Sequence, residues 1–72
     1  MNKSKLRSRM ILFGDTQESL AAAMNLALST LNAKINNYRG SCFHQSEIAF
    51  IKERYNLTGN DIDEIFFANE MS

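Results

Sequence analysis

Side chains that could recognise DNA bases are concentrated between residues 28 and 37, where the sequence reads LSTLNAKINN. Ser, Thr and Asn side chains can hydrogen-bond to the edges of bases, and the methyl group of Ala can contact that of thymine. At about 100° per residue in a helix, Leu31, Ile35 and Tyr38 share one side and should face the core. The opposite side carries Ser29, Thr30, Ala33, Asn36 and Asn37, with Asn32 and Lys34 on its flanks.

This opposite side is small, polar and uncharged, which would let the helix approach a groove closely. Asn is a poor helix former, so a face with a purely structural role would more often carry Glu, Lys and Ala. An Asn side chain can form two hydrogen bonds with adenine, the most discriminating contact that this face offers. We therefore predict a helix that enters the major groove of DNA. An ordinary solvated helix face is the alternative.

No catalytic or metal-binding pattern accompanies these residues. Cys42 is the only cysteine and His44 the only histidine, so neither a disulfide framework nor a structural zinc site can be built. The sequence has no Gly-rich phosphate loop and no recognisable nucleophile motif. The carboxylates of Asp61, Asp63 and Glu64 are typical of the start of a helix, where the dipole favours negative charge. We expect no enzyme activity, no metal and no cofactor.

Two short helices joined by a tight turn should position the DNA-contacting face. The first helix would bury Leu20, Ala21 and Met24, and the second would bury Leu31 and Ile35. Residues 25–27 between them leave no room for a longer loop or a strand. Two amphipathic helices joined in this way form a helix-turn-helix, whose second helix can enter a major groove. The alternative is an ordinary αα-hairpin of a small helical bundle.

The chain as a whole is predicted to be a single all-α domain of five helices over residues 1–72. The first helix runs from about residue 4 to residue 13, with Leu6, Met10 and Phe13 on one face, and stops at Gly14. The second begins at Asp15, with Glu18 completing a capping box.

The other three helices follow from the same signals. The third runs from about residue 28 to residue 38 and ends at Gly40. The fifth opens with a capping box of Thr58 and Asp61. Helical spacing places Ile48, Ile51 and Tyr55 of the fourth helix in the core, together with Ile62, Ile65 and Phe66 of the fifth.

Charge is distributed unevenly along the sequence. The chain has no net charge, but residues 1–40 carry +4 and residues 41–72 carry −4. The basic half contains the predicted helix-turn-helix, a polarity that suits a protein with one face toward phosphates. The N-terminus, Met-Asn-Lys-Ser-Lys, is followed by no long apolar run, so we expect neither a signal peptide nor a membrane span.

Residues 17 to 37 resemble the helix-turn-helix of the phage repressor and Cro-like (XRE-type) regulators. The likeness rests on Gln17-Glu18-Ser19, on Ala21 within the first helix, on Leu26 after the turn and on Leu31 within the second helix. It extends over roughly residues 6 to 67, with the helix-turn-helix at about 16–38. Where the family usually has Gly in the turn, this chain has Asn25. Asn tolerates the left-handed conformation well, so the turn should form.

The resemblance implies roles for individual residues. Gln17 matches a phosphate-contacting glutamine, whereas Ser29, Asn32 and Ala33 match readers of base edges and Asn36 matches a residue that contacts the DNA backbone. Leu28 stands where relatives often have a long polar reader, and the stem of Lys34 could lie along the core with its ammonium in water. The complete predicted DNA-binding set is Gln17, Leu28, Ser29, Thr30, Asn32, Ala33, Lys34, Asn36, Asn37 and Arg39.

Four large apolar side chains fall away from the buried stripes of their helices: Ile11, Leu12, Phe50 and Phe67. In so small a domain, several such residues indicate a surface for protein contact. A different helix phase, which would place all four in the core, is the alternative.

Two functions follow from these observations. The first is a phage-type transcriptional regulator that binds double-stranded operator DNA as a homodimer. The second is a modulator of repression that acts chiefly by binding a partner repressor, as the resemblance to Cro-like modulators in phages of Gram-positive bacteria implies. The absence of net charge and the apolar Leu28 favour the second, whereas Gln17, Ser29, Asn32 and Asn36 favour the first. For both functions we expect a location in the cytoplasm of a bacterial host cell.

Overall fold

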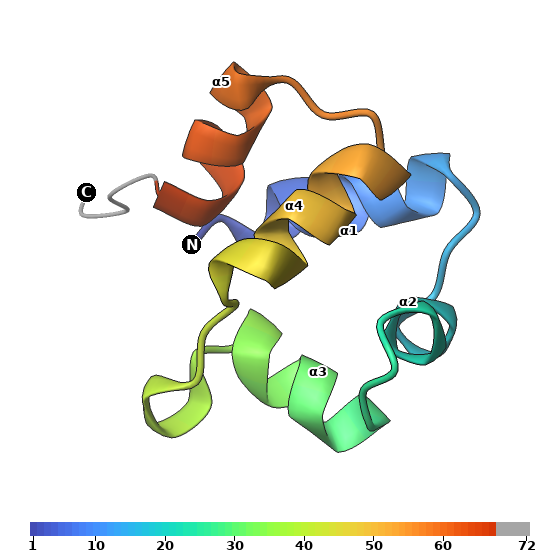
Figure 1. The fold of residues 1–72 in the computed structure, drawn as a ribbon, viewed down its shortest axis with the longest axis vertical. Coiled ribbons are helices and arrows are strands. Elements are labelled where there is room, and N and C mark those ends of the chain that lie inside the picture. Colours follow the sequence, from blue (N-terminus) through green and yellow to red (C-terminus); the bar gives the residue numbers. More distant parts are fainter. Residues whose placement is uncertain (68–72) are drawn as a thin grey trace.

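The computed structural model describes residues 1–67, which form α-helices joined by short links and contain no strand (Figure 1). The prediction of an all-α fold is confirmed for this part of the chain, while the single domain of residues 1–72 stays a prediction. The helices are α1 (Lys3–Leu12), α2 (Gln17–Ala23), α3 (Leu28–Ile35), α4 (Gln45–Arg54) and α5 (Gly59–Ile62). A 3₁₀ turn (Tyr38–Gly40) follows α3, and a π-helical turn (Asp63–Phe67) continues α5.

The hydrophobic core takes side chains from every helix. Its largest fully buried members are Leu6, Leu20, Leu31, Ile35, Ile51, Tyr55 and Ile65, all of them predicted to be buried. Met24, Ile48 and Phe66 are half-buried and pack against this core. Two core predictions were wrong, because Phe13 is 49% exposed and Tyr38 is 59% exposed. The Phe13 ring instead lies against the ring of Tyr55, with their centroids 5.4 Å apart.

The N-terminus of α2 differs from the prediction in its capping residue. Thr16, and not Asp15, caps the helix, and Ser19 takes the place expected for Glu18 in the capping box. The Ser19 N–H donates to Thr16 Oγ1 (3.1 Å), and the Thr16 N–H donates to Ser19 Oγ (2.9 Å). Asp15 is unavailable as a cap because Arg54 and Tyr55 of the fourth helix region bind its carboxylate. The predicted capping box of Thr58 and Asp61 is confirmed.

The C-terminus of α3 also differs from the prediction. The helix ends at Ile35, three residues before the predicted end at residue 38. Asn37 adopts a left-handed conformation (φ 53°) that stops the helix, and Arg39 does the same (φ 53°). Since the chain turns away after Ile35, the helical spacing that placed Tyr38 with Leu31 and Ile35 no longer applies.

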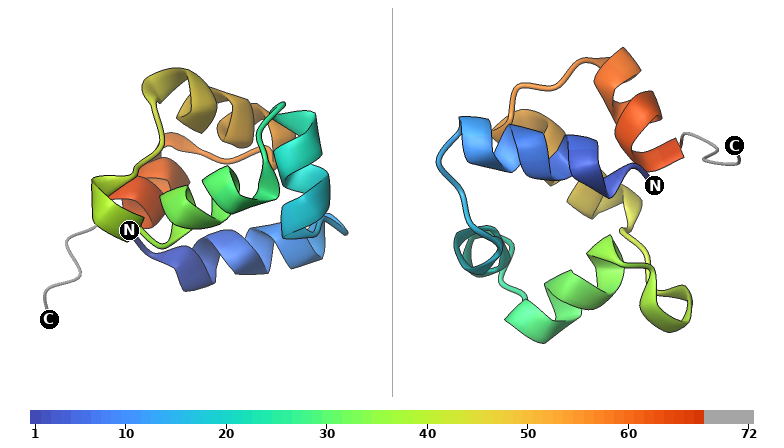
Figure 2. Two further views of the ribbon diagram at one scale, coloured as in Figure 1. Left: turned by 90° about the horizontal axis from the view of Figure 1, so that it is seen from below. Right: turned by 180° about the vertical axis from the view of Figure 1, so that it is seen from behind.

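The helices α1 and α5 lie side by side, which brings the basic and acidic halves of the chain together (Figure 2). Lys5 pairs with Glu64 and with Asp61, and Arg9 Nη2 lies 3.4 Å from Asp61 Oδ1. The N–H of Asn2 donates to the carbonyl oxygen of Ile65 (2.7 Å). The charge asymmetry of the sequence therefore does not give a wholly basic face in space, because cations of α1 are neutralised by carboxylates of the C-terminal region.

No helix among residues 1–67 has the length and apolar character needed to cross a membrane. The same residues contain no cluster of three or more His, Cys, Asp or Glu side chains that could hold a metal ion.

Candidate nucleic-acid interface

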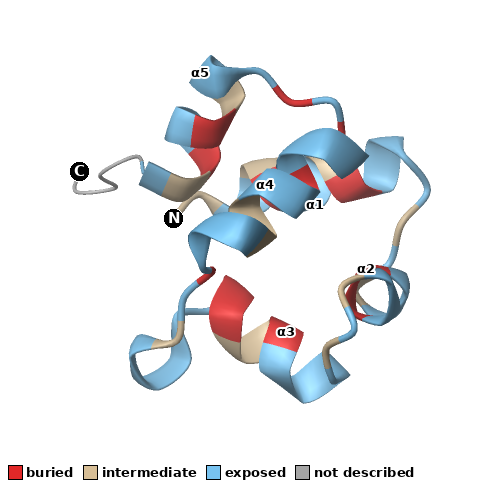
Figure 3. Cartoon of the chain, in the orientation of Figure 1, coloured by how far each residue is buried: buried red, intermediate tan, exposed pale blue. Residues whose placement is uncertain are grey.

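The helices α2 and α3 are joined by a tight turn over residues 24–27. Asn25 has the left-handed conformation (φ 59°) that the sequence predicted for it. The N–H of Asn25 donates to the carbonyl oxygen of Ala22 (3.1 Å), and that of Leu26 donates to the carbonyl oxygen of Ala21 (2.8 Å). These bonds fix the direction in which α3 leaves α2. As a result α3 lies at the edge of the molecule, with one side against the core and the other open (Figure 3).

The open side of α3 is uncharged. Leu28, Ser29 and Thr30 are exposed, and Asn32 and Ala33 are half-exposed. The structure thus brings these five predicted DNA-contacting residues together on one accessible helix face. Their side chains offer hydroxyl groups, one amide, one methyl group and one isobutyl group to a partner.

Lys34 does not belong to this open face. It is 9% exposed, and its ammonium donates to the carbonyl oxygen of Cys42 (3.1 Å) and pairs with Glu47 Oε1 (3.1 Å). Burial alone would raise the pKa of Glu47, but the His44 N–H and the Lys34 ammonium together hold that pKa below its usual value. The expectation of an ammonium in water was wrong. Lys34 links α3 to the start of α4 and has no ammonium free for a phosphate.

Asn36 and Asn37, predicted to belong to the helix, lie just past its end. Asn36 is exposed, but its Nδ2 donates to the carbonyl oxygen of Asn32 (3.0 Å), and its Oδ1 accepts from Lys3 Nζ (3.0 Å). Lys3 comes from the first turn of α1, so a cation 33 positions before Asn36 in the sequence lies at the C-terminal end of α3. No local pattern in the sequence could have revealed this proximity.

Arg39 is the other cation near this end of α3. It is exposed, and its guanidinium carbon lies 5.3 Å from the centre of the Tyr38 ring. A hollow of about 470 Å³ separates α3 from the following loop and is lined by Ser29, Thr30, Ala33, Lys34, Gly40, Ser41, Cys42 and His44. The loop therefore forms a second wall beside the open face of α3.

Gln17 lies at the other end of the candidate interface, at the start of α2. It is half-exposed and shares a small hollow of about 190 Å³ with Arg7, Ile11 and Asp15. Arg7 is exposed, so its guanidinium can accompany Gln17 toward a phosphate. Of these two residues, the resemblance singled out Gln17 for a phosphate contact.

Ion pairs within residues 1–67 occupy half of the eight Lys and Arg side chains: Lys5, Arg9, Lys34 and Arg54. Within the same residues Lys3, Arg7, Arg39 and Lys52 form no ion pair. The helices α2 and α3 with their turn (residues 17–35) form the α2–α3 unit. Lys3, Arg7 and Arg39 lie at the ends of this unit. The cations available to a polyanion therefore flank the neutral face and do not occupy it.

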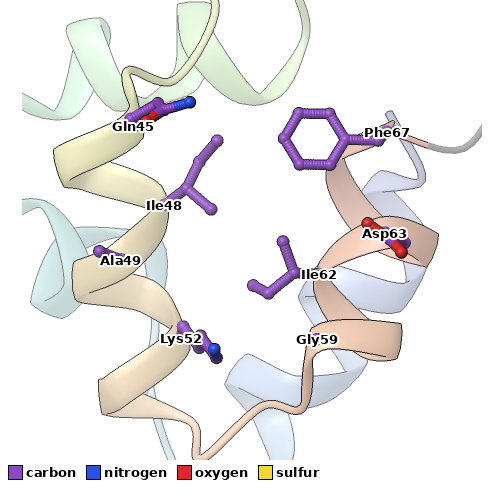
Figure 4. A pocket seen from close by; sticks show the side chains of 8 residues that line it. All are labelled: Gln45, Ile48, Ala49, Lys52, Gly59, Ile62, Asp63 and Phe67. Carbon is purple, nitrogen blue, oxygen red and sulfur yellow. The ribbon is translucent and has the colours of Figure 1, made fainter.

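The four apolar residues predicted to lie at an interface are all exposed: Ile11 (76%), Leu12 (70%), Phe50 (38%) and Phe67 (61%). The alternative that placed them in the core was wrong. They do not form one patch, since Ile11, Phe50 and Phe67 line three separate hollows. Phe67 closes one end of an apolar hollow of about 400 Å³ between α4 and α5, beside Ile48 and Ile62 (Figure 4).

Comparisons with known proteins give this chain no relative. No protein-family model, no curated protein and no solved structure matches it. The resemblance to repressor and Cro-like regulators thus rests on the residues of the chain itself, from Gln17 to Asn37.

Proposed function

We propose that this protein is a DNA-binding transcriptional regulator of a phage-type genetic switch, and that α3 enters the major groove of operator DNA. The observation that carries the proposal is the open face of α3, which is exposed, uncharged and rich in hydrogen-bonding groups. A tight turn holds this helix beside α2 at the edge of the molecule. Recognition helices of helix-turn-helix proteins have this placement and contact base edges through their N-terminal residues.

Base contacts would come from the middle of the open face. The amide of Asn32 can donate to N7 and accept from N6 of adenine in the bidentate sense allowed for Asn, once its orientation is set by the DNA. Ser29 and Thr30, one turn earlier, can donate to or accept from either base pair type. Ala33 is small, so the backbone of α3 can come close to the floor of the groove.

Phosphate contacts would come from both ends of the interface. Arg39 and Lys3 lie near the C-terminal end of α3, and Arg7 and Gln17 lie at the start of α2. Three cations that each neutralise one phosphate give a salt slope of roughly −3, at about −0.9 per phosphate. We therefore expect weak, salt-sensitive binding by one protomer, and dimerisation on a symmetric operator would multiply the affinity.

Selection of bound duplexes from a random library, followed by titration of the selected duplex, tests this proposal. Asn32→Ala should reduce discrimination between selected and random DNA by roughly 1–3 kcal/mol, because a bidentate base contact is lost. Asn60→Ala is the matched control, since Asn60 is exposed on α5 and far along the chain from α3. Equal discrimination by both variants, or no selection of any sequence, would exclude α3 as a reader.

A second function is favoured by the exposed apolar residues. Ile11 and Leu12 are adjacent at the C-terminal end of α1, and each is at least 70% exposed. A protein that modulates repression by binding a repressor, or a second copy of this chain, would bury such a pair. Both roles place the protein in the cytoplasm of a bacterial host cell. The double substitution Ile11→Ser and Leu12→Ser should reduce the fraction of the protein that sediments as a complex with the repressor. An unchanged fraction would exclude this surface.

A further inference from the structure

Leu28 is an unusual residue on the open face of α3. It is the first residue of the helix and is 42% exposed, although it is large and apolar. Leu31 and Ile35 of the same helix are core residues, whereas Leu28 is neither in the core nor packed against it. The residue before it, Ala27, is exposed and makes no side-chain cap to the helix. The N-terminal end of α3 thus presents a short apolar tip beside the hydroxyl groups of Ser29 and Thr30.

The major groove offers one apolar group that such a tip could contact. Thymine carries a methyl group at C5, whereas cytosine, adenine and guanine present only hydrogen-bonding atoms or a C–H edge there. A leucine side chain can neither donate nor accept a hydrogen bond. Against adenine or guanine it would therefore desolvate polar atoms without replacing their partners. Contact with a thymine methyl group buries more apolar surface than contact with the C5–H of cytosine.

Leu28 and Asn32 are four residues apart and therefore lie on the same side of α3. Four residues of α-helix rise about 6 Å, which is less than two base-pair steps of about 3.4 Å each. The isobutyl group of Leu28 and the amide of Asn32 can thus reach the same base pair or base pairs up to two steps apart.

We propose that Leu28 reads a thymine through its methyl group, and that the half-site of this protein places this thymine within two base pairs of the adenine bound by Asn32. This inference rests on the proposed binding of α3 in the major groove. Under this proposal Leu28 contributes to sequence specificity, although it stands where repressor and Cro-like regulators often have a long polar residue that contacts bases. The ligand is accordingly a short A·T-containing half-site.

Deoxyuridine tests the proposal directly, because it keeps every hydrogen-bonding group of thymine and lacks only the methyl group. Each thymine of the selected duplex is replaced in turn by deoxyuridine, and the dissociation constant of the wild-type protein is measured. At one position the replacement should weaken binding about four-fold, as expected for the loss of one buried methyl group. Leu28→Ala should bind the thymine and deoxyuridine duplexes with equal affinity.

Lys52→Ala is the control, because Lys52 is exposed on α4 and belongs neither to α3 nor to the Ile11–Leu12 pair that a second copy could bury. It should keep the full difference between the two duplexes. Thermal midpoints measured for both variants show that each is folded, as exposure of both side chains predicts. If no deoxyuridine position weakens binding, or if Leu28→Ala retains the difference, the proposal for Leu28 is overturned.

The outcomes separate this inference from the proposed function. Insensitivity to deoxyuridine together with lost discrimination in Asn32→Ala would leave α3 as the reader and remove only the role of Leu28. Failure of the wild-type protein to select any duplex would overturn both.

Discussion

Two regions of this protein use polar groups in opposite ways. Asp15, Ser19, Arg54 and Tyr55, called here the Asp15 cluster, join the start of α2 to the end of α4 through charged hydrogen bonds. Arg54 donates to both carboxylate oxygens of Asp15 (2.7 and 2.9 Å), and the Tyr55 hydroxyl donates to Oδ2 (2.7 Å). The open face of α3 has neutral side chains with their polar groups toward solvent. Charge thus stabilises the fold, while the proposed recognition relies on uncharged groups.

The environment of the Asp15 cluster explains this division. The side chain of Asp15 is 9% exposed, so its carboxylate would be costly to bury without partners. The Arg54 guanidinium above all holds the pKa of Asp15 well below its usual range, against the effect of burial, and Tyr55 and Ser19 add to this lowering. Burial and the nearby Asp15 carboxylate raise the pKa of Tyr55 well above its usual value.

The largest expected effect comes from removing the charge of Asp15. Asp15→Asn removes the negative charge that accepts hydrogen bonds from Arg54, Tyr55 and Ser19. It should lower the free energy of unfolding by about 3 kcal/mol, because hydrogen bonds to a charged group are the strong ones and the Asp15 side chain is largely buried. Urea unfolding of Asp15→Asn and Glu53→Gln measures this loss. Glu53 is exposed beside Arg54, so its variant should stay within about 0.5 kcal/mol of the wild type. Equal stability of the two variants would show that the cluster is dispensable.

The same cluster predicts a dependence of stability on pH. The pKa of Asp15 is lower in the folded state than its unfolded value of about 3.9. The contribution of Asp15 to the free energy of unfolding is therefore fully present above the unfolded pKa. It is lost as the pH falls through that value toward the folded pKa. The difference in unfolding free energy between wild type and Asp15→Asn should therefore shrink between about pH 5 and pH 2. A difference that stays constant over this range would contradict the assignment.

A smaller loss of stability is expected at Lys34, which lies on α3 but is buried and paired with Glu47. Lys34→Met leaves Glu47 and the carbonyl oxygen of Cys42 without their partner and should cost about 2 kcal/mol of stability. The slope of DNA affinity against salt should not change, because the ammonium contacts no phosphate. A decrease in that slope would return Lys34 to the DNA-binding surface.

The smallest effect is expected at Arg39, whose exposed guanidinium is close only to the ring of Tyr38 among the contacts described. Arg39→Ala should leave the unfolding free energy within about 0.5 kcal/mol and reduce the magnitude of the salt slope by about 0.9. Lys52→Ala is the control, because Lys52 is also exposed but lies on α4 beside the hollow shared with α5. If both variants change the slope equally, the contact with DNA is not confined to the α2–α3 unit.

Sequence patterns that span only a few residues, such as turn residues, helix caps and helical periodicity, predicted much of this fold. The left-handed Asn25, the cap at Thr58 and the buried faces of α2 and α3 each depend on neighbours within one or two turns, and the structure confirms them. The exposed side of α3 with Ser29, Thr30 and Ala33 followed from the same helical period, whereas Leu28 was assigned through the resemblance to repressor and Cro-like regulators. The accessibility of this side could be predicted for that reason, whereas its binding of DNA stays a prediction.

Contacts between distant segments could not be predicted in this way. Asp15 was taken as the cap of α2 because its partner, Arg54, lies 39 residues further along the chain. Lys34 was assigned to DNA because nothing near it in the sequence indicates that it reaches the carbonyl oxygen of Cys42 and the carboxylate of Glu47. The contact between Lys3 and Asn36 could not be predicted, because the two residues lie 33 positions apart and meet only in the folded chain.

Amide chemical-shift mapping with the selected duplex tests the central claim most directly. The claim is that the neutral face of α3, flanked by Lys3, Arg7 and Arg39, contacts DNA. We predict that the largest shifts fall on residues 28–33 and 39–41, with smaller shifts at Arg7 and Gln17 and none in the hollow between α4 and α5. Shifts centred on Ile48, Ile62 and Phe67, with α3 unaffected, would contradict the claim.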